Sequence, residues 1–298
     1  LQFLMLNKVL NKKILFKTLS LFSVVRGYNI VFIIVAQFIS AIYFFSENKS
    51  FSDVILDINV WLIILCSAFS ISAGYIVNSI YDSQKDLINR PLKTTLENQI
   101  SGKTKFLVYV FFNSITLILA FLISFRALVF FGFYILGIII YSIKISRYPF
   151  TRNIFSVLLS ITPFFAIILY YKNYSYEIFS HSIFLFLIVL IREVVKDLEN
   201  FAGDFTLKYK TIPVKYGEKV SKLYISILIV FVFLISIHIL KSYEISYMKY
   251  YHFVVYPFFI VFNYILWKNN SKETFQKLHN ALKLLIILGI FSIILHSF

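Results

Sequence analysis

Four of the six aspartates in this 298-residue chain lie in two short segments, residues 78–86 and 193–204. In the first segment, oxygen-bearing side chains recur every four positions, which places them on one face of a helix. The second segment repeats this spacing around Glu193. Carboxylate and amide oxygens suit Mg²⁺, and two facing acidic helices can hold two metal ions around a diphosphate. We therefore predict these metal ligands: Asn78, Asp82, Asp86, Asp197, Asn200 and Asp204.

Basic residues beside both acidic segments favour a diphosphate ligand over a simple cation site. Lys and Arg form charge-assisted hydrogen bonds to a phosphate that gains charge as it leaves. The predicted diphosphate-binding residues are Arg90, Lys144, Arg147 and Arg192, and the predicted catalytic residues are Asp82, Asp86, Lys144, Asp197 and Asp204. The alternative is that the acids are solvated helix ends and that the bases are ordinary loop residues.

Membrane-spanning helices must position these residues. The chain is 59% hydrophobic and only 14% charged, which excludes a soluble domain and indicates a polytopic membrane protein. The apolar runs show no strand-like alternation, and this excludes an outer-membrane barrel. A span needs about 20 apolar residues. We expect an all-α bundle of about nine transmembrane helices, at residues 27–46, 58–80, 105–124, 127–143, 154–171, 179–197, 223–240, 250–267 and 281–297.

The net charge of +15 is distributed unevenly along the chain. With nine spans, the N-terminus and the even-numbered connections share one side, and that side carries 24 of the 29 Lys and Arg residues. Such an asymmetry marks the cytoplasmic side of an inner cell membrane and argues against nucleic-acid binding. We expect the N-terminus and both acidic segments to be cytoplasmic, and the C-terminus to lie outside. Residues 1–26 should form a cytoplasmic segment, amphipathic over residues 9–25.

The two longest connections, residues 81–104 and 198–222, each follow an acidic segment. Long loops on one face of a bundle can cover a site, so we expect a cytoplasmic cap there. The acidic segments end the second and the sixth span, which is a weak sign of an internal repeat of two related bundles. No soluble domain or linker interrupts residues 1–298, which we interpret as a single transmembrane domain.

Other kinds of site find little support. The five histidines are scattered, fall mostly on or near the opposite face and are not expected near the acids, which argues against zinc and against a serine triad. No phosphate-binding glycine loop for nucleotides is present. Pro163 should kink the fifth span and open a central apolar cavity. Aromatic residues such as Tyr141, Phe164 and Phe165 are candidates to line it, although core packing is the alternative for each.

The ordered motifs resemble the UbiA-type membrane prenyltransferase superfamily. Residues 78–91 read Asn-Ser-Ile-Tyr-Asp-Ser-Gln-Lys-Asp-Leu-Ile-Asn-Arg-Pro, similar to the family's first acidic motif. Residues 192–204 read Arg-Glu-Val-Val-Lys-Asp-Leu-Glu-Asn-Phe-Ala-Gly-Asp, similar to its second. Residues 141–147 and the Lys-Thr-Ile-Pro-Val-Lys-Tyr-Gly stretch at residues 210–217 resemble further family segments. The resemblance covers most of the chain.

Two positions depart from the family pattern. Ser79 stands where the family usually has a second Asp, and Asn200 stands where related sequences often have Asp. Two-metal binding remains the expectation, with weaker binding or a degenerate homologue as the alternative. The second motif most resembles that of the geranylgeranylglycerol-phosphate geranylgeranyltransferase branch.

The resemblance implies an Mg²⁺-dependent enzyme that moves a polyprenyl group from a polyprenyl diphosphate to a lipophilic acceptor within the bilayer. The acceptor is either a prenylglycerol phosphate, such as geranylgeranylglyceryl phosphate, or an aromatic quinone precursor. A secondary transporter is the alternative from another class, but transporters usually place ionisable sites near the midplane of the membrane. The oligomeric state is left open.

Overall fold

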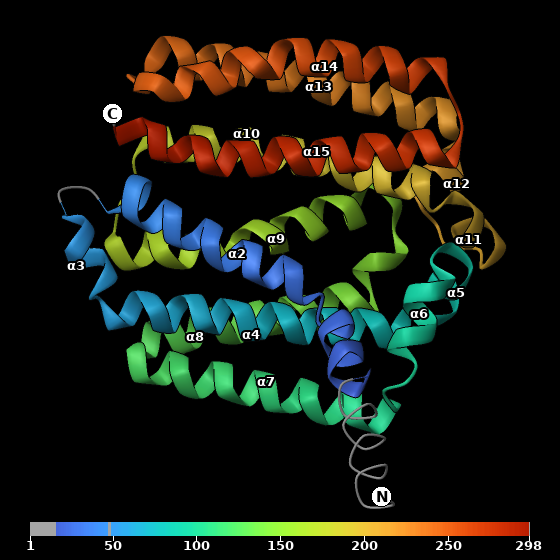
Figure 1. Ribbon diagram of the computed structural model, residues 1–298, viewed down its shortest axis with the longest axis horizontal. Coiled ribbons are helices and arrows are strands. Elements are labelled where there is room, and N and C mark those ends of the chain that lie inside the picture. Colours follow the sequence, from blue (N-terminus) through green and yellow to red (C-terminus); the bar gives the residue numbers. More distant parts are fainter. Residues whose placement is uncertain (1–15, 47–48, 298) are drawn as a thin grey trace, which may run out of the picture. The chain divides into compact units, whose positions relative to one another are not determined.

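The computed structural model describes residues 16–46 and 49–297. Regular structure in that part of the chain is helical, and nine of its helical segments are long and apolar enough to cross a membrane (Figure 1). A helix satisfies its own backbone hydrogen bonds, as a span in hydrocarbon must. The nine-span prediction is confirmed. The segments are α2 Gly27–Ser40 with η1 Ala41–Phe45, α4 Ile58–Tyr81, α7 Gly102–Ile123, α8 Phe125–Ile143 with η2 Ile145–Arg147, α9 Pro149–Tyr171, α10 Tyr176–Glu199, α13 Glu218–Ser242, η3 Ser246–Met248 with α14 Lys249–Lys268, and α15 Lys272–Ser292 with η4 Ile293–Ser297.

Several spans begin earlier than the apolar runs predict because polar caps set the helix starts. Ser101 precedes α7 and its hydroxyl accepts a hydrogen bond from the Thr104 backbone N–H. Ser271 does the same for α15, which starts nine residues before the predicted position 281. Such caps satisfy N–H groups that have no partner within the helix. The helices therefore extend beyond their apolar cores.

The described residues pack into two compact units, the first within Leu1–Ile34 and Leu65–Ser142 and the second within Val35–Ile64 and Ile143–Phe298. In the first unit α4 is joined to α7 by the buried Cys66 thiol, which donates to the Thr116 carbonyl at 3.5 Å. Gly74 lets Ile138 of α8 approach α4, since an added Cβ there would lie 3.2 Å from the Ile138 side chain. The single-domain interpretation of residues 1–298 stays a prediction.

The second unit is built around α10, which packs against α9, α13 and α15, while α14 packs against α13 and α15. Ile191, Val194 and Val195 of α10 are fully buried. Pro163 lies inside α9, and its carbonyl accepts a hydrogen bond from the Gln37 amide at 2.9 Å. The burial of α10 fixes the position of the second acidic segment at its C-terminal end.

The long connections fold into short helices, as a cap requires. Residues 81–104 contain α5 Ser83–Asn89 and α6 Pro91–Glu97, and residues 198–222 contain α11 Phe201–Thr206 and α12 Ile212–Tyr216. α3 Phe51–Ile55 lies in another connection. That the short helices cover a site stays a prediction. Of the predicted amphipathic helix, residues 16–24 are helical, and residues 9–15 lie outside the described part of the chain.

Candidate active site

The first acidic motif keeps its predicted helical stacking across a helix boundary. α4 ends at Tyr81 and Asp82 adopts φ −92° before α5 begins. The Asp82 N–H still donates to the Asn78 carbonyl at 2.8 Å, and the Asp86 N–H donates to the Asp82 carbonyl at 2.8 Å. All three side chains are half-buried, and the Asn78 amide oxygen accepts a hydrogen bond from Ser142 at 3.3 Å. Three oxygen-bearing side chains therefore follow one helical face at the end of α4.

A buried carboxylate, Glu97 of α6, lies beside this motif and was not expected from the sequence. It is 4% exposed, and the Lys93 ammonium is 3.2 Å from one of its oxygens. The Ser23 hydroxyl donates to Glu97 at 3.1 Å and the Ser79 hydroxyl donates at 3.5 Å. The Lys105 ammonium donates to Ser79 at 3.0 Å. Ser79, which stands where the family usually has a second Asp, is thus part of a charged network.

This network reaches the acidic motif electrostatically. Burial, together with the charge of Arg26, lowers the pKa of Lys93 from its ordinary value, while Glu97 and Asp86 oppose that shift. The Arg26 guanidinium lies 4.8 Å from the centre of the Tyr75 ring of α4. The end of α4 therefore carries cations and carboxylates together, as an anion and metal site requires.

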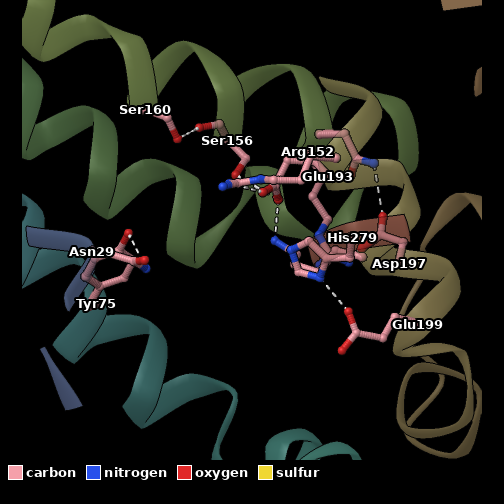
Figure 2. A network of polar contacts seen from close by, with 12 residues as sticks. Asn29, Tyr75, Arg152, Ser156, Ser160, Glu193, Asp197, Glu199 and His279 are labelled. Carbon is pink, nitrogen blue, oxygen red and sulfur yellow. Dashed lines mark hydrogen bonds and ion pairs between the residues drawn. The ribbon is translucent and has the colours of Figure 1, made fainter. Parts of the chain in front are cut away.

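In the second unit, the predicted ligand Asp197 is held by two side chains of α9. It is 1% exposed and lies near the end of α10. The Arg152 guanidinium is 3.3 Å from one carboxylate oxygen (Figure 2). The Asn153 amide donates to the other oxygen at 3.0 Å. Both partners come from the first turns of α9, which Pro149 starts. Two neighbouring residues thus fix both oxygens of Asp197.

Glu193 lies one turn before Asp197 and is surrounded by cations. Arg192 is 3.0 Å from one Glu193 oxygen, Lys196 contacts the other, and the Ser156 hydroxyl also donates to Glu193 at 3.4 Å. Arg192, a predicted diphosphate ligand, is therefore paired with a carboxylate here. A phosphate would have to compete for it or share it with Glu193.

Asn200 and Asp204 lie where α10 gives way to α11. Asn200 has φ −94° and ends the regular helix, so the continuous face predicted for the second motif is interrupted. The Asp204 N–H nevertheless donates to the Asn200 carbonyl at 3.2 Å, and the Tyr209 N–H donates to the Asp204 carbonyl at 2.8 Å. The Asp204 side chain is completely buried, and Asn200 is nearly so. The turn carries the chain from the span to the Asp204 position.

Two histidines do contact acids, contrary to the sequence-based expectation. His279 of α15 lies 2.5 Å from the Glu199 carboxylate, and both residues are buried (Figure 2). His296 contacts Glu177 at 2.8 Å near the other end of α10. Sequence separations of 80 and 119 residues hide both pairs. The packing of α15 on α10 brings His279 to Glu199, and His296 reaches Glu177 from η4, which follows α15.

The remaining predicted diphosphate residues lie at helix ends. Lys144 is exposed between α8 and η2, and Arg147 is exposed within η2. Arg90 is half-buried at the junction of α5 and α6. Their roles in diphosphate binding stay predictions.

The second unit also contains an apolar cavity that is partly open. Its lining residues come mainly from η1, α9, α10 and α15, with Met248 of η3 and Tyr251 of α14. They include Phe164 and Phe165, as predicted, together with Phe184 and Ile188. Tyr141 does not belong to its lining. Ile188 precedes Asp197 by nine residues on α10, a rise of about 14 Å at 1.5 Å per residue. One helix thus connects an apolar cavity with the second acidic motif.

The oxygen-rich side chains fit Mg²⁺ better than a transition metal. Within residues 16–46 and 49–297, no three Asp, Glu, His or Cys side chains gather into a metal site. Mg²⁺ does not require such a cage, since it commonly uses one or two carboxylates, water and substrate phosphates. Asn78, Asp82 and Asp86, half-buried on one helical face, match that donor set.

Comparison with known proteins gives consistent relatives. A digeranylgeranylglyceryl phosphate synthase from Methanobrevibacter smithii is 28% identical over 279 residues, covering 87% of this chain and 91% of the relative. The synthase of the same name from Thermococcus sibiricus is 28% identical over 249 residues, 79% of this chain and 84% of the relative.

Solved structures share the fold. A structure of digeranylgeranylglyceryl phosphate synthase in membranes has a TM-score of 0.67 at 21% identity and covers 94% of this chain and 99% of that one. A UbiA homolog from Archaeoglobus fulgidus bound to GPP and Mg²⁺ has a TM-score of 0.68 at 14% identity, covering 92% and 99%. The model of the UbiA prenyltransferase family matches residues 30–290. This multi-pass membrane protein therefore belongs to the UbiA prenyltransferase family, and its activity is that of a prenyltransferase.

Proposed function

We propose that the chain transfers a geranylgeranyl group from its diphosphate to the free hydroxyl of geranylgeranylglyceryl phosphate. The bond between the first prenyl carbon and the diphosphate oxygen breaks, and its electron pair leaves with the diphosphate. The acceptor oxygen forms an ether bond to that carbon, and the diphosphate takes the hydroxyl proton. The observation that carries the reaction type is the oxygen-bearing face of Asn78, Asp82 and Asp86 at the end of a span. The names of the relatives support the acceptor.

Mg²⁺ would neutralise the diphosphate and stabilise its charge as it leaves. We assign metal binding to the two acidic motifs, at Asn78, Asp82, Asp86, Asp197, Asn200 and Asp204. The flanking cations Arg90, Lys144, Arg147 and Arg192 would donate charge-assisted hydrogen bonds to the phosphate oxygens. The A. fulgidus homolog, which was solved with GPP and Mg²⁺, supports this assignment. The membrane protects the allylic cation from water until the acceptor captures it.

The orientation follows from charge. Lys and Arg concentrate on the side that holds both motifs, so we propose that the N-terminus and the active site are cytoplasmic. Soluble diphosphate would then leave into the cytoplasm, while both lipids remain in the bilayer.

We assign the apolar cavity of the second unit to the far end of the prenyl chain. Ser182 lines the cavity, whereas Ile183 beside it on α10 is exposed. Ser182→Leu should raise the KM for geranylgeranyl diphosphate about tenfold, because added methylenes occupy space that the long chain needs. The KM for a prenyl diphosphate of half that length should change less than twofold. Ile183→Phe is the matched control, and equal effects of Ser182→Leu on both chain lengths would contradict the assignment.

The function is tested with purified protein in liposomes, supplied with Mg²⁺ and labelled geranylgeranyl diphosphate. Geranylgeranylglyceryl phosphate or an aromatic quinone precursor is added as the acceptor, and the lipids are identified by mass spectrometry. We expect diphosphate release and a lipid with two geranylgeranyl chains only with the glycerol phosphate. Product from the aromatic acceptor alone would instead establish the alternative acceptor, and no product with either would refute the proposal.

A further inference from the structure

The Glu97 network at the end of α4 contains more charge than packing requires. A buried carboxylate is costly unless partners compensate it. Glu97 has three partners from three segments: Ser23, Ser79 at the end of α4, and Lys93 within its own helix. All of these belong to the first unit. The carboxylate therefore ties three segments together directly beside the first acidic motif.

Ser79 connects this carboxylate to a second cation. Its hydroxyl accepts a hydrogen bond from Lys105 at 3.0 Å and donates one to Glu97 at 3.5 Å. The Lys105 side chain comes from the first turn of α7 and is buried. A carboxylate at position 79 would meet Lys105 directly. With serine there, Lys105 reaches negative charge through one hydroxyl group, and that charge belongs to Glu97.

The position of Ser79 gives this arrangement a consequence for the site. Ser79 follows Asn78 and precedes Asp82 by less than one turn of the helix, so its environment is that of the motif. Lys93 is close enough to both Asp86 and Glu97 for each to act on its pKa. Without Glu97, the uncompensated charges of Lys93 and Lys105 would repel a metal ion held by Asp82 and Asp86.

We propose that Glu97 is a positioning residue that supplies, from α6, the negative charge that the first motif lacks at position 79. The inference rests on the proposed metal-dependent function. Glu97 holds Lys93 and Lys105 in neutralised positions, and so preserves the affinity of the motif for a divalent cation. Ser79 and Glu97 form one functional pair in this chain.

The test uses Mn²⁺ as the probe, measured by electron paramagnetic resonance on the full chain in lipid nanodiscs. Glu97→Gln should weaken Mn²⁺ binding about tenfold, since residues that support metal ligands commonly have effects of 10- to 100-fold. The KM for the acceptor should not change. Ser79→Asp combined with Glu97→Gln should return the Mn²⁺ affinity to within about threefold of the wild type. Glu244→Gln, at an exposed position, is the matched control.

The double variant separates charge supply from folding. The proposal would be overturned if Glu97→Gln bound Mn²⁺ with wild-type affinity. It would also be overturned if the double variant Ser79→Asp, Glu97→Gln bound Mn²⁺ as weakly as Glu97→Gln alone, whether or not its thermal midpoint falls. The failure of the proposed function looks different: the wild type binds Mn²⁺ but makes no prenylated lipid with any acceptor. In that case the Mn²⁺ titration still decides the role of Glu97.

Discussion

Asp82→Ala is expected to lower the rate of Mg²⁺-dependent diphosphate release by about 100- to 1,000-fold, comparable to the loss of one group that stabilises charge in a transition state. Asp82 lies in the middle of the oxygen-bearing face, one turn from both Asn78 and Asp86, and its backbone joins α4 to α5. Removing the carboxylate leaves the other two ligands eight residues apart. The measurement is single-turnover release of labelled diphosphate in liposomes at saturating Mg²⁺.

Gln84→Ala is the matched control for this variant because Gln84 is exposed on the same short helix. It should retain the wild-type rate. Raising the Mg²⁺ concentration should not restore Asp82→Ala, whereas Glu97→Gln should recover at high Mg²⁺. Full activity in Asp82→Ala would remove the first motif from the proposed site.

The spans could be predicted from the sequence because their cause is local. A span in hydrocarbon needs a continuous apolar run with internal hydrogen bonds. The C-terminal ends of α4 and α9 lie within one residue of the predicted ends. The starts of α10 and α15 could not be read from hydropathy. Ser175 and Ser271 cap these helices beyond the apolar run, where polar residues continue the helix outside hydrocarbon.

The helical face of the first acidic motif could also be predicted from the sequence, because helical spacing alone places Asn78, Asp82 and Asp86 on one face. Their partners were not. Arg152 meets Asp197 from 45 positions away, and only the packing of α9 on α10 brings the two together. Glu97 is hidden for a different reason. It looks like an ordinary charged residue of a basic connection, and its burial depends on contacts with Ser23 and Ser79.

The histidines show where the sequence misleads. A lone histidine in an apolar span carries no signal of its partner, so His279 gave no reason to expect contact with Glu199. The weak internal repeat predicted the placement of the acidic motifs better, because each compact unit contains one acidic motif at the end of a well-buried helix. Charge placement along this chain therefore predicted where the acidic motifs lie on the helices better than it predicted the contacts that support them.

Asp197→Asn should lower both stability and the rate of prenyl transfer. The Arg152 side chain is only 12% exposed and would lose its contact with the Asp197 carboxylate. Breaking a buried ion pair by removing one charge costs about 3–5 kcal/mol, because the remaining charge stays desolvated. We expect a clearly lower thermal midpoint in detergent and a rate at least about 100-fold below that of the wild type.

Combining Asp197→Asn with Arg152→Gln separates these two effects. Two neutral amides can replace the buried ion pair, so the thermal midpoint should return towards that of the wild type. The rate should stay low, because neutralising Arg152 does not restore a carboxylate to the second motif. Arg126→Gln, at an exposed position, controls for the loss of one positive charge. If the double variant regained the wild-type rate, Asp197 would only anchor α9 to α10, and the remaining acids, Asp204 among them, would have to provide the metal site of the second motif.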